Sequence, residues 1–162
     1  MNSTSKLNNS LTISYLELRT TIGVIAMMLP FVLVIGKDLI EGWWILNSVS
    51  DYYYSVMGNV FVGAICAIAV FLGSYRGYER KDAVAGNLAC VFGIGTALFP
   101  TSPETFATAN QTIIGYVHLF FAGCFFLTLA YFALVLFRKT FPNGEPTRMK
   151  LLRNKVYAML VI

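Results

Sequence analysis

Long runs of apolar residues alternate with short polar stretches along this chain, and each run ends at a charged residue or proline. A helix that crosses the ~30 Å hydrocarbon core of a bilayer needs about 20 mainly apolar residues, within a range of ~17–25. Four runs meet this requirement. We therefore predict an all-α, polytopic bundle with four complete transmembrane helices, over residues 20–36, 52–75, 83–99 and 112–137.

The segments outside these runs predict a simple division of the chain. Residues 1–19 are expected to form a cytoplasmic tail, 20–137 a four-helix transmembrane domain, and 138–162 a basic cytoplasmic segment. The chain ends on seven apolar residues, 156–162, which are too few to cross a bilayer. They are either the beginning of a truncated fifth span, which the lack of a stop signal favours, or part of a short basic helix at the membrane interface.

Composition supports lipid as the solvent of this chain. Hydrophobic residues make up 57% and charged residues 12%, whereas soluble domains are ~45–50% apolar and about 25% charged. The mean hydropathy is +0.66. The net charge of +4 comes from basic residues in short loops rather than from one surface patch, so we expect no nucleic-acid partner.

The positions of lysine and arginine predict an orientation. Of the 12 such residues, all but Lys37 lie before the first run, between the second and third, or after the fourth. Because basic loops stay in the cytoplasm, the N-terminus, the second loop and the C-terminal segment are expected to be cytoplasmic. Membrane lipid is the partner that this arrangement implies.

Small residues recur every four positions in the third run, at Ala85, Ala89, Gly93 and Ala97. Such a stripe allows a neighbouring backbone to approach closely, which is how helices associate in lipid. We therefore expect the third helix to be central and the phenylalanine-rich fourth helix to face lipid in part. The same stripe could also hold a second copy of the chain or a membrane partner subunit.

A few polar residues within the runs are the candidates for function, because polar groups at membrane depth are costly. Asp51, Ser55 and Asn59 are spaced at i, i+4 and i+8, which predicts one face of the second helix. Thr96 and His118, the only histidine, are expected at similar depth. Together these residues predict a polar layer that opens outward.

Three functions are compatible with this layer. In the first, Asn59, Thr96 and His118 bind a ligand in a non-enzymatic binding, sensing or transport-related protein, with His118 responding to external pH. In the second, Asp51, Ser55 and His118 are the acid–base and nucleophilic groups of a membrane hydrolase. In the third, hydrogen bonds in the layer only hold the helices together, and the chain is a structural subunit that joins a membrane complex through the small-residue stripe of the third helix.

Cofactor chemistry is not indicated. A zinc site needs about three protein ligands, and one histidine with three dispersed cysteines, Cys66, Cys90 and Cys124, does not form a metal-ligand pattern or a disulfide framework. The glycine-rich nucleotide motifs, the zinc-protease motif and the serine-hydrolase elbow are also absent from the sequence. We expect no metal and no cofactor, and favour a protein that is not an enzyme.

Three blocks of the sequence are similar to a known group of proteins. SVSDYYYSVMGNVFVG (48–63), SYRGYERKDAVAGNLACVFGIGTALFPT (74–101) and YVHLFFAGCFFLTLAYF (116–132) resemble multi-span proteins of the bacterial inner membrane that carry domain-of-unknown-function labels. The resemblance covers about 16–137 and implies an inner-membrane location, further spans after 162 and no assigned activity. Those proteins have a basic–acidic pair where this chain has Gly58 and Asn59.

Overall fold

The structure is a computed structural model in which residues 15–42, 45–75, 79–138 and 148–159 are described. Within these ranges the chain forms helices and turns and has no strand, which confirms the predicted all-α class. The elements are α2 (Tyr15–Glu41), the 3-10 helix η1 (Val49–Tyr54), α3 (Gly58–Gly73), α4 (Arg80–Leu98), α5 (Ala109–Tyr131), the π-helix η2 (Phe132–Leu136) and α6 (Arg148–Met159).

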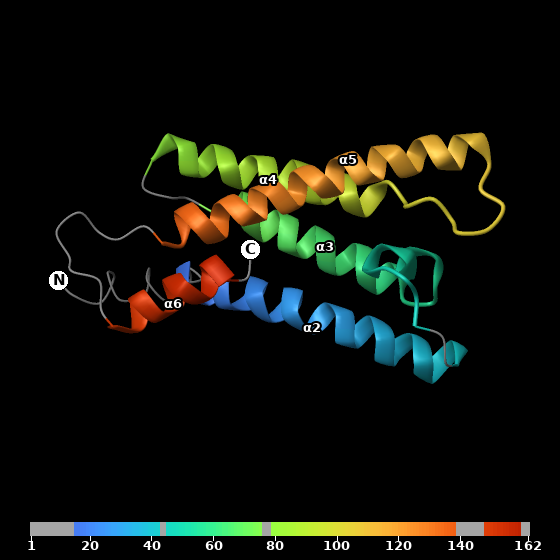
Figure 1. Cartoon of the computed structure of the whole chain (residues 1–162), viewed down its shortest axis with the longest axis horizontal. Helices are drawn as coiled ribbons and strands as arrows, with labels where there is room; N and C mark the ends of the chain where they lie inside the picture. Colours follow the sequence, from blue (N-terminus) through green and yellow to red (C-terminus); the bar gives the residue numbers. More distant parts are fainter. Residues whose placement is uncertain (1–14, 43–44, 76–78, 139–147, 160–162) are drawn as a thin grey trace, which may run out of the picture.

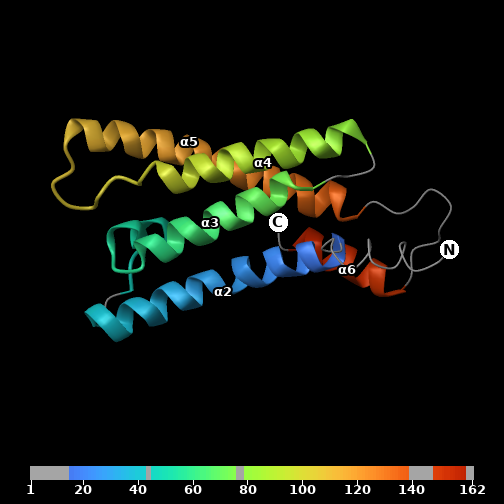
Figure 2. The ribbon, with the colours of Figure 1, turned by 180° about the vertical axis from the view of Figure 1, so that it is seen from behind.

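The four long helices run alternately in opposite directions, and Figures 1 and 2 show them side by side. The main contacts join helices that follow one another in the chain: α2 packs on α3, α3 on α4, and α4 on α5. The short α6 packs against η2. Both α3 and α4 therefore occupy central places, whereas the sequence predicted α4 alone.

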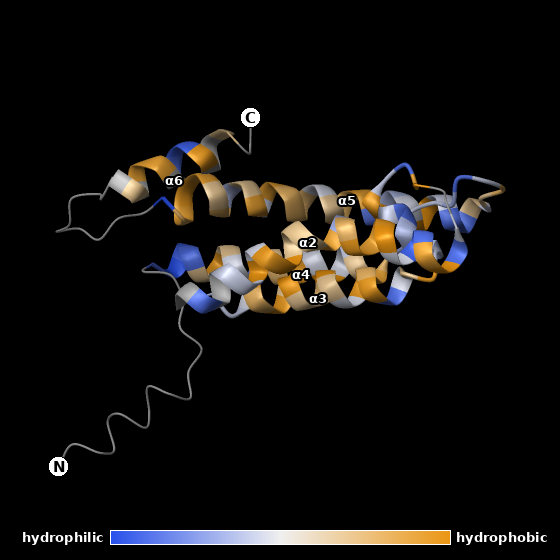
Figure 3. Cartoon of the chain, turned by 90° about the horizontal axis from the view of Figure 1, so that it is seen from below, coloured by the Kyte–Doolittle hydropathy of each residue, from blue (hydrophilic) through white to orange (hydrophobic). Residues whose placement is uncertain are grey.

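The bundle has two ends of different character. We call one the η1 end, which carries η1 and the segment 99–108 between α4 and α5, and the other the α6 end (Figure 1). Figure 3 shows hydrophilic residues gathered toward the two ends and hydrophobic residues along the helices between them. This distribution matches the alternation of apolar runs and polar stretches in the sequence.

Buried apolar side chains form two clusters. The cluster toward the η1 end joins α2, η1 and α3 through Leu29, Leu33, Tyr52, Met57 and Phe61. The other joins α3, α4, α5 and η2, and its buried members are Ile68, Leu72, Tyr75, Ala85, Ala89, Phe125, Phe132 and Leu136.

Small residues bring α3 and α4 close together. A Cβ atom on Gly86 would lie 2.7 Å from the carbonyl oxygen of Leu72, and one on Gly93 would lie 2.7 Å from the Cβ atom of Ala69. Neither distance is compatible with a real side-chain atom, so these positions exclude larger residues. All four residues of the predicted stripe, Ala85, Ala89, Gly93 and Ala97, are buried.

Two helices are long and apolar enough to cross a membrane, over Thr20–Glu41 with 22 residues and Ala109–Leu136 with 28 residues. The structure therefore supports two candidate spans and does not support the predicted four complete spans. The helix Gly58–Gly73 is apolar but has 16 residues. The helix α4, which corresponds to the third predicted span, begins with the charged residues Arg80, Lys81 and Asp82.

The second predicted helix, 52–75, was wrong in its first turns. Ser48 and Asp51 form a capping box that starts η1 instead, with Asp51 Oδ2 accepting from the Ser48 amide at 2.8 Å. The backbone then turns, and α3 begins only at Gly58, where a Cβ atom would collide with the carbonyl oxygen of Tyr53. Asp51, Ser55 and Asn59 therefore do not stack on one helix face.

The other boundaries differ from the predicted ones by up to five residues. The first helix begins at Tyr15, so residues 15–19 of the predicted tail are helical, and it continues through Pro30 past the predicted end at Gly36 to Glu41. Lys37 and Glu41 pair across its last turn at 3.5 Å. The predicted range 112–137 corresponds to α5 and η2. Of the predicted final segment, 148–159 is the helix α6, while residues 1–14 of the predicted tail and 160–162 lie outside the described residues.

Candidate functional site

Polar side chains join the two connecting segments at the η1 end. The Asn47 side-chain amide donates to a carboxylate oxygen of Glu104. The Tyr54 hydroxyl donates to the carbonyl oxygen of Thr101 over 2.7 Å. These bonds link the segment between α2 and α3 to the segment between α4 and α5, so the two connections form one cap over the bundle.

His118 makes further hydrogen bonds between segments below this cap. Its side chain is 2% exposed, with Nδ1 2.7 Å from the carbonyl oxygen of Phe99 and Nε2 3.1 Å from the hydroxyl oxygen of Ser50. A carbonyl oxygen only accepts, so Nδ1 carries a proton, and in the neutral ring Nε2 accepts from Ser50. His118 thus connects α5 to the end of α4 and to η1.

The other two members of the predicted hydrolase group have different partners. Asp51 Oδ2 accepts from the amide and the hydroxyl of Ser48, each at 2.8 Å. The Ser55 hydroxyl donates to the carbonyl oxygen of Tyr52 at 2.8 Å. Among the bonds of the described residues, His118 meets Ser50 rather than Asp51 or Ser55.

Two more predicted residues of the polar layer lie apart from this cap. Thr96 is buried, and its hydroxyl donates over 2.8 Å to the carbonyl oxygen of Phe92, one turn earlier in the same helix. Asn59 is exposed in the first turn of α3. Neither residue lines the pocket described next.

A polar pocket of about 230 Å³ opens at the η1 end, and we call it the η1-end pocket. Asp51 and Ser55 of the predicted polar layer line it, while His118 is not among its lining residues. The pocket is lined by Lys37, Glu41, Leu46, Asp51, Tyr54, Ser55, Pro103, Glu104 and Thr105.

Negative charge predominates in this pocket. Lys37 is 7% exposed and pairs with Glu41 at 3.5 Å, and the other Glu41 oxygen accepts from the amide of Val56 at 2.9 Å. Asp51 and Glu104 bring two further carboxylates, each with one oxygen bonded to the chain. Three carboxylates and one ammonium group leave an excess of two negative charges, which attracts cations.

Tyr54 forms one wall of the pocket. Burial, and to a lesser extent the neighbouring Tyr53, raises the pKa of the Tyr54 phenol above its ordinary value of 10.0. The two rings contact edge to face, with centroids 5.2 Å apart. The phenol is thereby held in the protonated form that donates to Thr101.

Several residues of this end were missed at the sequence level. The spacing Ser48-x-x-Asp51 is a helix-start signal that could have predicted η1. The spacing of Lys37 and Glu41, four residues apart, could have predicted their pairing. By contrast, no local pattern brings Ser50 to His118, which lies 68 positions away.

The described residues contain no group of three or more histidine, cysteine, aspartate or glutamate side chains that could hold a metal ion. No protein-family model matches the chain, and no match was found among curated proteins or among solved structures. The resemblance to multi-span inner-membrane proteins therefore stays a prediction.

Proposed function

We propose that this chain is a multi-pass protein of the cell inner membrane whose η1-end pocket binds a small organic cation on the outer side. In this proposal α2 to α5 all cross the bilayer, with the N-terminus in the cytoplasm. The protein acts as a binding, sensing or transport-related component and not as an enzyme.

The membrane placement is supported by apolar side chains on the outside of the bundle. On α2, Met27 is 70% and Phe31 58% exposed, and on α5, Phe126 is 69% and Leu127 73% exposed. Soluble monomers rarely expose contiguous apolar patches of this extent. Lipid would cover these side chains without a further protein partner.

The two shorter helices fit the same placement. In α3, 16 residues extend for ~24 Å at 1.5 Å per residue, and the tyrosines of the preceding η1 turn suit the headgroup region just outside the hydrocarbon. In α4, Arg80 and Lys81 lie in the first turn, where long cationic side chains reach the lipid headgroups. The start of α4, with Arg80 and Lys81, and the end of η2, which Arg138 follows, also lie at the same end of the bundle, as a cytoplasmic α6 end requires (Figure 1).

The excess of carboxylates in the η1-end pocket is the observation that carries the binding proposal. It stands at the opposite end from the basic segments, so a cation outside the cell would meet an attractive field. The wall residues Tyr54 and Leu46 offer apolar surface for an alkylated ammonium group, which binds well over an aromatic face.

Binding can be measured by titrating choline and spermidine into the detergent-purified full chain and following its thermal unfolding. Glu104→Gln and Asp51→Asn keep an acceptor oxygen for their chain partners and remove a charge each. Each change is expected to weaken binding about tenfold, or ~1.4 kcal/mol. Asp38→Asn, an exposed change on α2 outside the pocket, is the matched control; equal losses in all three variants would contradict the proposal.

The orientation has its own test. In a variant without the native cysteines, new cysteines at Thr105 and at Arg80 are labelled in intact cells with a membrane-impermeant maleimide. Labelling is expected at Thr105 and not at Arg80. The reverse pattern would place the η1-end pocket in the cytoplasm and refute an outward-facing site.

A hydrolase is the second candidate, and one contact favours it. Ser50 and His118 are placed as a nucleophile and a base, with the His118 ring oriented by the carbonyl oxygen of Phe99. A fluorophosphonate probe should then label wild-type protein and not Ser50→Ala. Ser55→Ala is the control, since the Ser55 hydroxyl bonds to its own turn; unlabelled wild-type protein would refute this candidate.

A further inference from the structure

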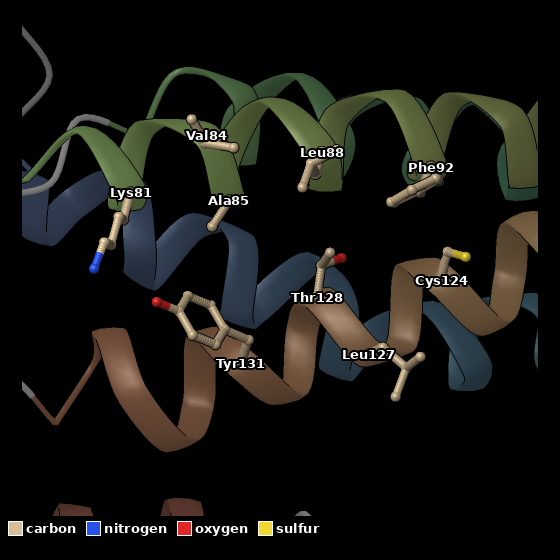
Figure 4. Close-up of a pocket in the computed structure, with 9 residues that line it drawn as sticks. All are labelled: Lys81, Val84, Ala85, Leu88, Phe92, Cys124, Leu127, Thr128 and Tyr131. Atoms are coloured by element: carbon tan, nitrogen blue, oxygen red, sulfur yellow. The ribbon is translucent and has the colours of Figure 1, made fainter.

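An open apolar groove lies between α4 and α5, toward the α6 end and away from the η1-end pocket. Its volume is about 390 Å³. Figure 4 shows the side chains that line it, which come from the adjacent helices α4 and α5. They are Lys81, Val84, Ala85, Leu88, Phe92, Cys124, Leu127, Thr128 and Tyr131.

Small residues at two positions between α4 and α5 leave the space that forms the groove. Ala85 on α4 and Cys124 on α5 leave room between the larger side chains of Leu88 and Leu127. The Thr128 hydroxyl donates to the carbonyl oxygen of Phe125 in its own helix over 2.7 Å, so it adds little polarity to the groove. The remaining surface is suited to a hydrocarbon chain.

One end of the groove is closed and the other is polar. Phe92 packs against Phe121, with ring centroids 6.3 Å apart, at the end nearer the middle of the bundle. At the opposite end Figure 4 shows the Lys81 amine and the Tyr131 hydroxyl at the same mouth. From Lys81 to Phe92 the helix advances 11 residues, or ~16 Å, which is close to half of the ~30 Å hydrocarbon core.

We propose that this groove binds one anionic phospholipid of the cytoplasmic leaflet. Its phosphate is held by the Lys81 amine and the Tyr131 hydroxyl, and one acyl chain extends along Leu88 and Leu127 toward Phe92. The proposal rests on the membrane orientation given under "Proposed function", because that orientation places the α6 end at the cytoplasmic leaflet.

Charge complementarity selects this occupant over an uncharged lipid or an apolar helix. Lys81 is exposed and makes no ion pair within the part of the chain that the structure describes. The nearby carboxylates of Glu79 and Asp82 accept hydrogen bonds from backbone amides in the capping box of α4. A basic pocket between membrane helices on the cytoplasmic side is a recurrent site for anionic headgroups.

The test measures which lipid the full chain retains. Protein is equilibrated with equimolar phosphatidylglycerol and phosphatidylcholine, and the retained lipids are counted by native mass spectrometry. Wild type should prefer phosphatidylglycerol, and Lys81→Gln should lower that preference by more than fivefold, because it removes both the general attraction of one cation at a lipid surface, about fivefold, and the contact with the bound phosphate. Arg80→Gln, which removes the same charge one residue outside the groove, should lower the preference by no more than the general fivefold, and Lys81→Arg should restore it.

A second pair of variants examines the acyl chain. Cys124→Leu fills the groove and should reduce the number of retained lipids, whereas Cys66→Leu on α3, outside the groove, should not. Equal losses in Lys81→Gln and Arg80→Gln would show a general basic loop and overturn the proposal. Unchanged lipid retention by a Cys124→Leu variant with a normal melting temperature would also overturn the proposal. Displacement of the bound lipid by inorganic phosphate alone would do the same.

Failure of this proposal is distinguishable from failure of the proposed orientation. The maleimide labelling is repeated on Lys81→Gln in cells. Labelling at Thr105 together with no preference for phosphatidylglycerol in wild type would reject the groove site alone. Labelling at Arg80 instead would reject the orientation on which the site depends.

Discussion

The two ends of the bundle are held together by different interactions. At the η1 end, Tyr54, Asn47 and His118 bond to groups in other segments of the chain. At the α6 end, apolar contacts predominate in the described residues, such as the edge-to-face contact of Tyr75 with Phe132 at 5.1 Å. Hydrogen bonds have fixed directions and apolar contacts do not. The arrangement of the η1 end therefore depends on the positions of donors and acceptors, and that of the α6 end on how well the side chains fill the space.

This difference also separates the two candidate binding regions. The η1-end pocket has an excess of carboxylates and is formed in part by the two connecting segments that hydrogen bonds join. The groove of Figure 4 is apolar with a single lysine, and regular helices form its walls. A change that alters the turn geometry should therefore affect the first and leave the second intact.

The largest such effect is expected from Gly58→Ala. Its new methyl group would collide with the Tyr53 carbonyl oxygen, which is backbone and cannot rotate away. Overpacking of this kind costs ~1–3 kcal/mol, and choline binding should be lost while phosphatidylglycerol retention persists. Gly63→Ala in the same helix is the control, because nothing lies within 4 Å of its Cβ position. Thermal unfolding of the two proteins in detergent measures the difference, and equal melting temperatures would contradict it.

A smaller effect is expected from His118→Ala, which removes the bonds to Phe99 and Ser50. Side-chain hydrogen bonds between membrane helices contribute about 0.6 kcal/mol each, with a maximum near ~1.7. Limited proteolysis should show faster cleavage in the segment 99–108 of the variant. Thr96→Val serves for comparison, since the Thr96 hydroxyl bonds within its own helix. Equal cleavage in both variants would argue against a stabilising role for the His118 hydrogen bonds.

The smallest effect is expected from Tyr54→Phe, which loses one hydrogen bond to Thr101. The expected cost is about 0.5–1.5 kcal/mol. Because the pKa of Tyr54 is raised in the folded protein, this contribution is fully present below pH 10.0 and is lost as the pH rises through the folded pKa. The difference in phenolate absorbance between wild type and Tyr54→Phe should therefore titrate above 10.0; a midpoint below that value would contradict a raised pKa of Tyr54.

The helices were predictable because apolar periodicity and length are local properties. The positions of α4 and α5 follow from runs that end at Pro100 and Arg138. The predicted start at Tyr52 was wrong because an uncharged run says nothing about a backbone turn inside it. The turn depends on a capping box at Ser48 and on the room that Gly58 leaves for Tyr53.

The candidate site was predictable in part for the same reason. Asp51 and Ser55 were predicted to share one polar layer from their spacing in the sequence, and both line the η1-end pocket. The outward orientation of that layer stays a prediction. The pairing of His118 with Ser50 depends on how α5 packs against η1, which no local spacing encodes. Lys81 and Tyr131 line the same end of the groove because α4 and α5 are antiparallel, and this too is a tertiary property.

The order in which the helices pack has a consequence for how the chain reaches this structure. The main interfaces of the described bundle join α2 to α3, α3 to α4 and α4 to α5, all neighbours along the chain. The entropy of closing a loop rises only slowly with its length, and proteins rich in contacts between neighbouring segments assemble quickly. Each pair of helices can therefore form once its second helix has been synthesised, and the long-range pairing of His118 with Ser50 can form only after α5 has been made.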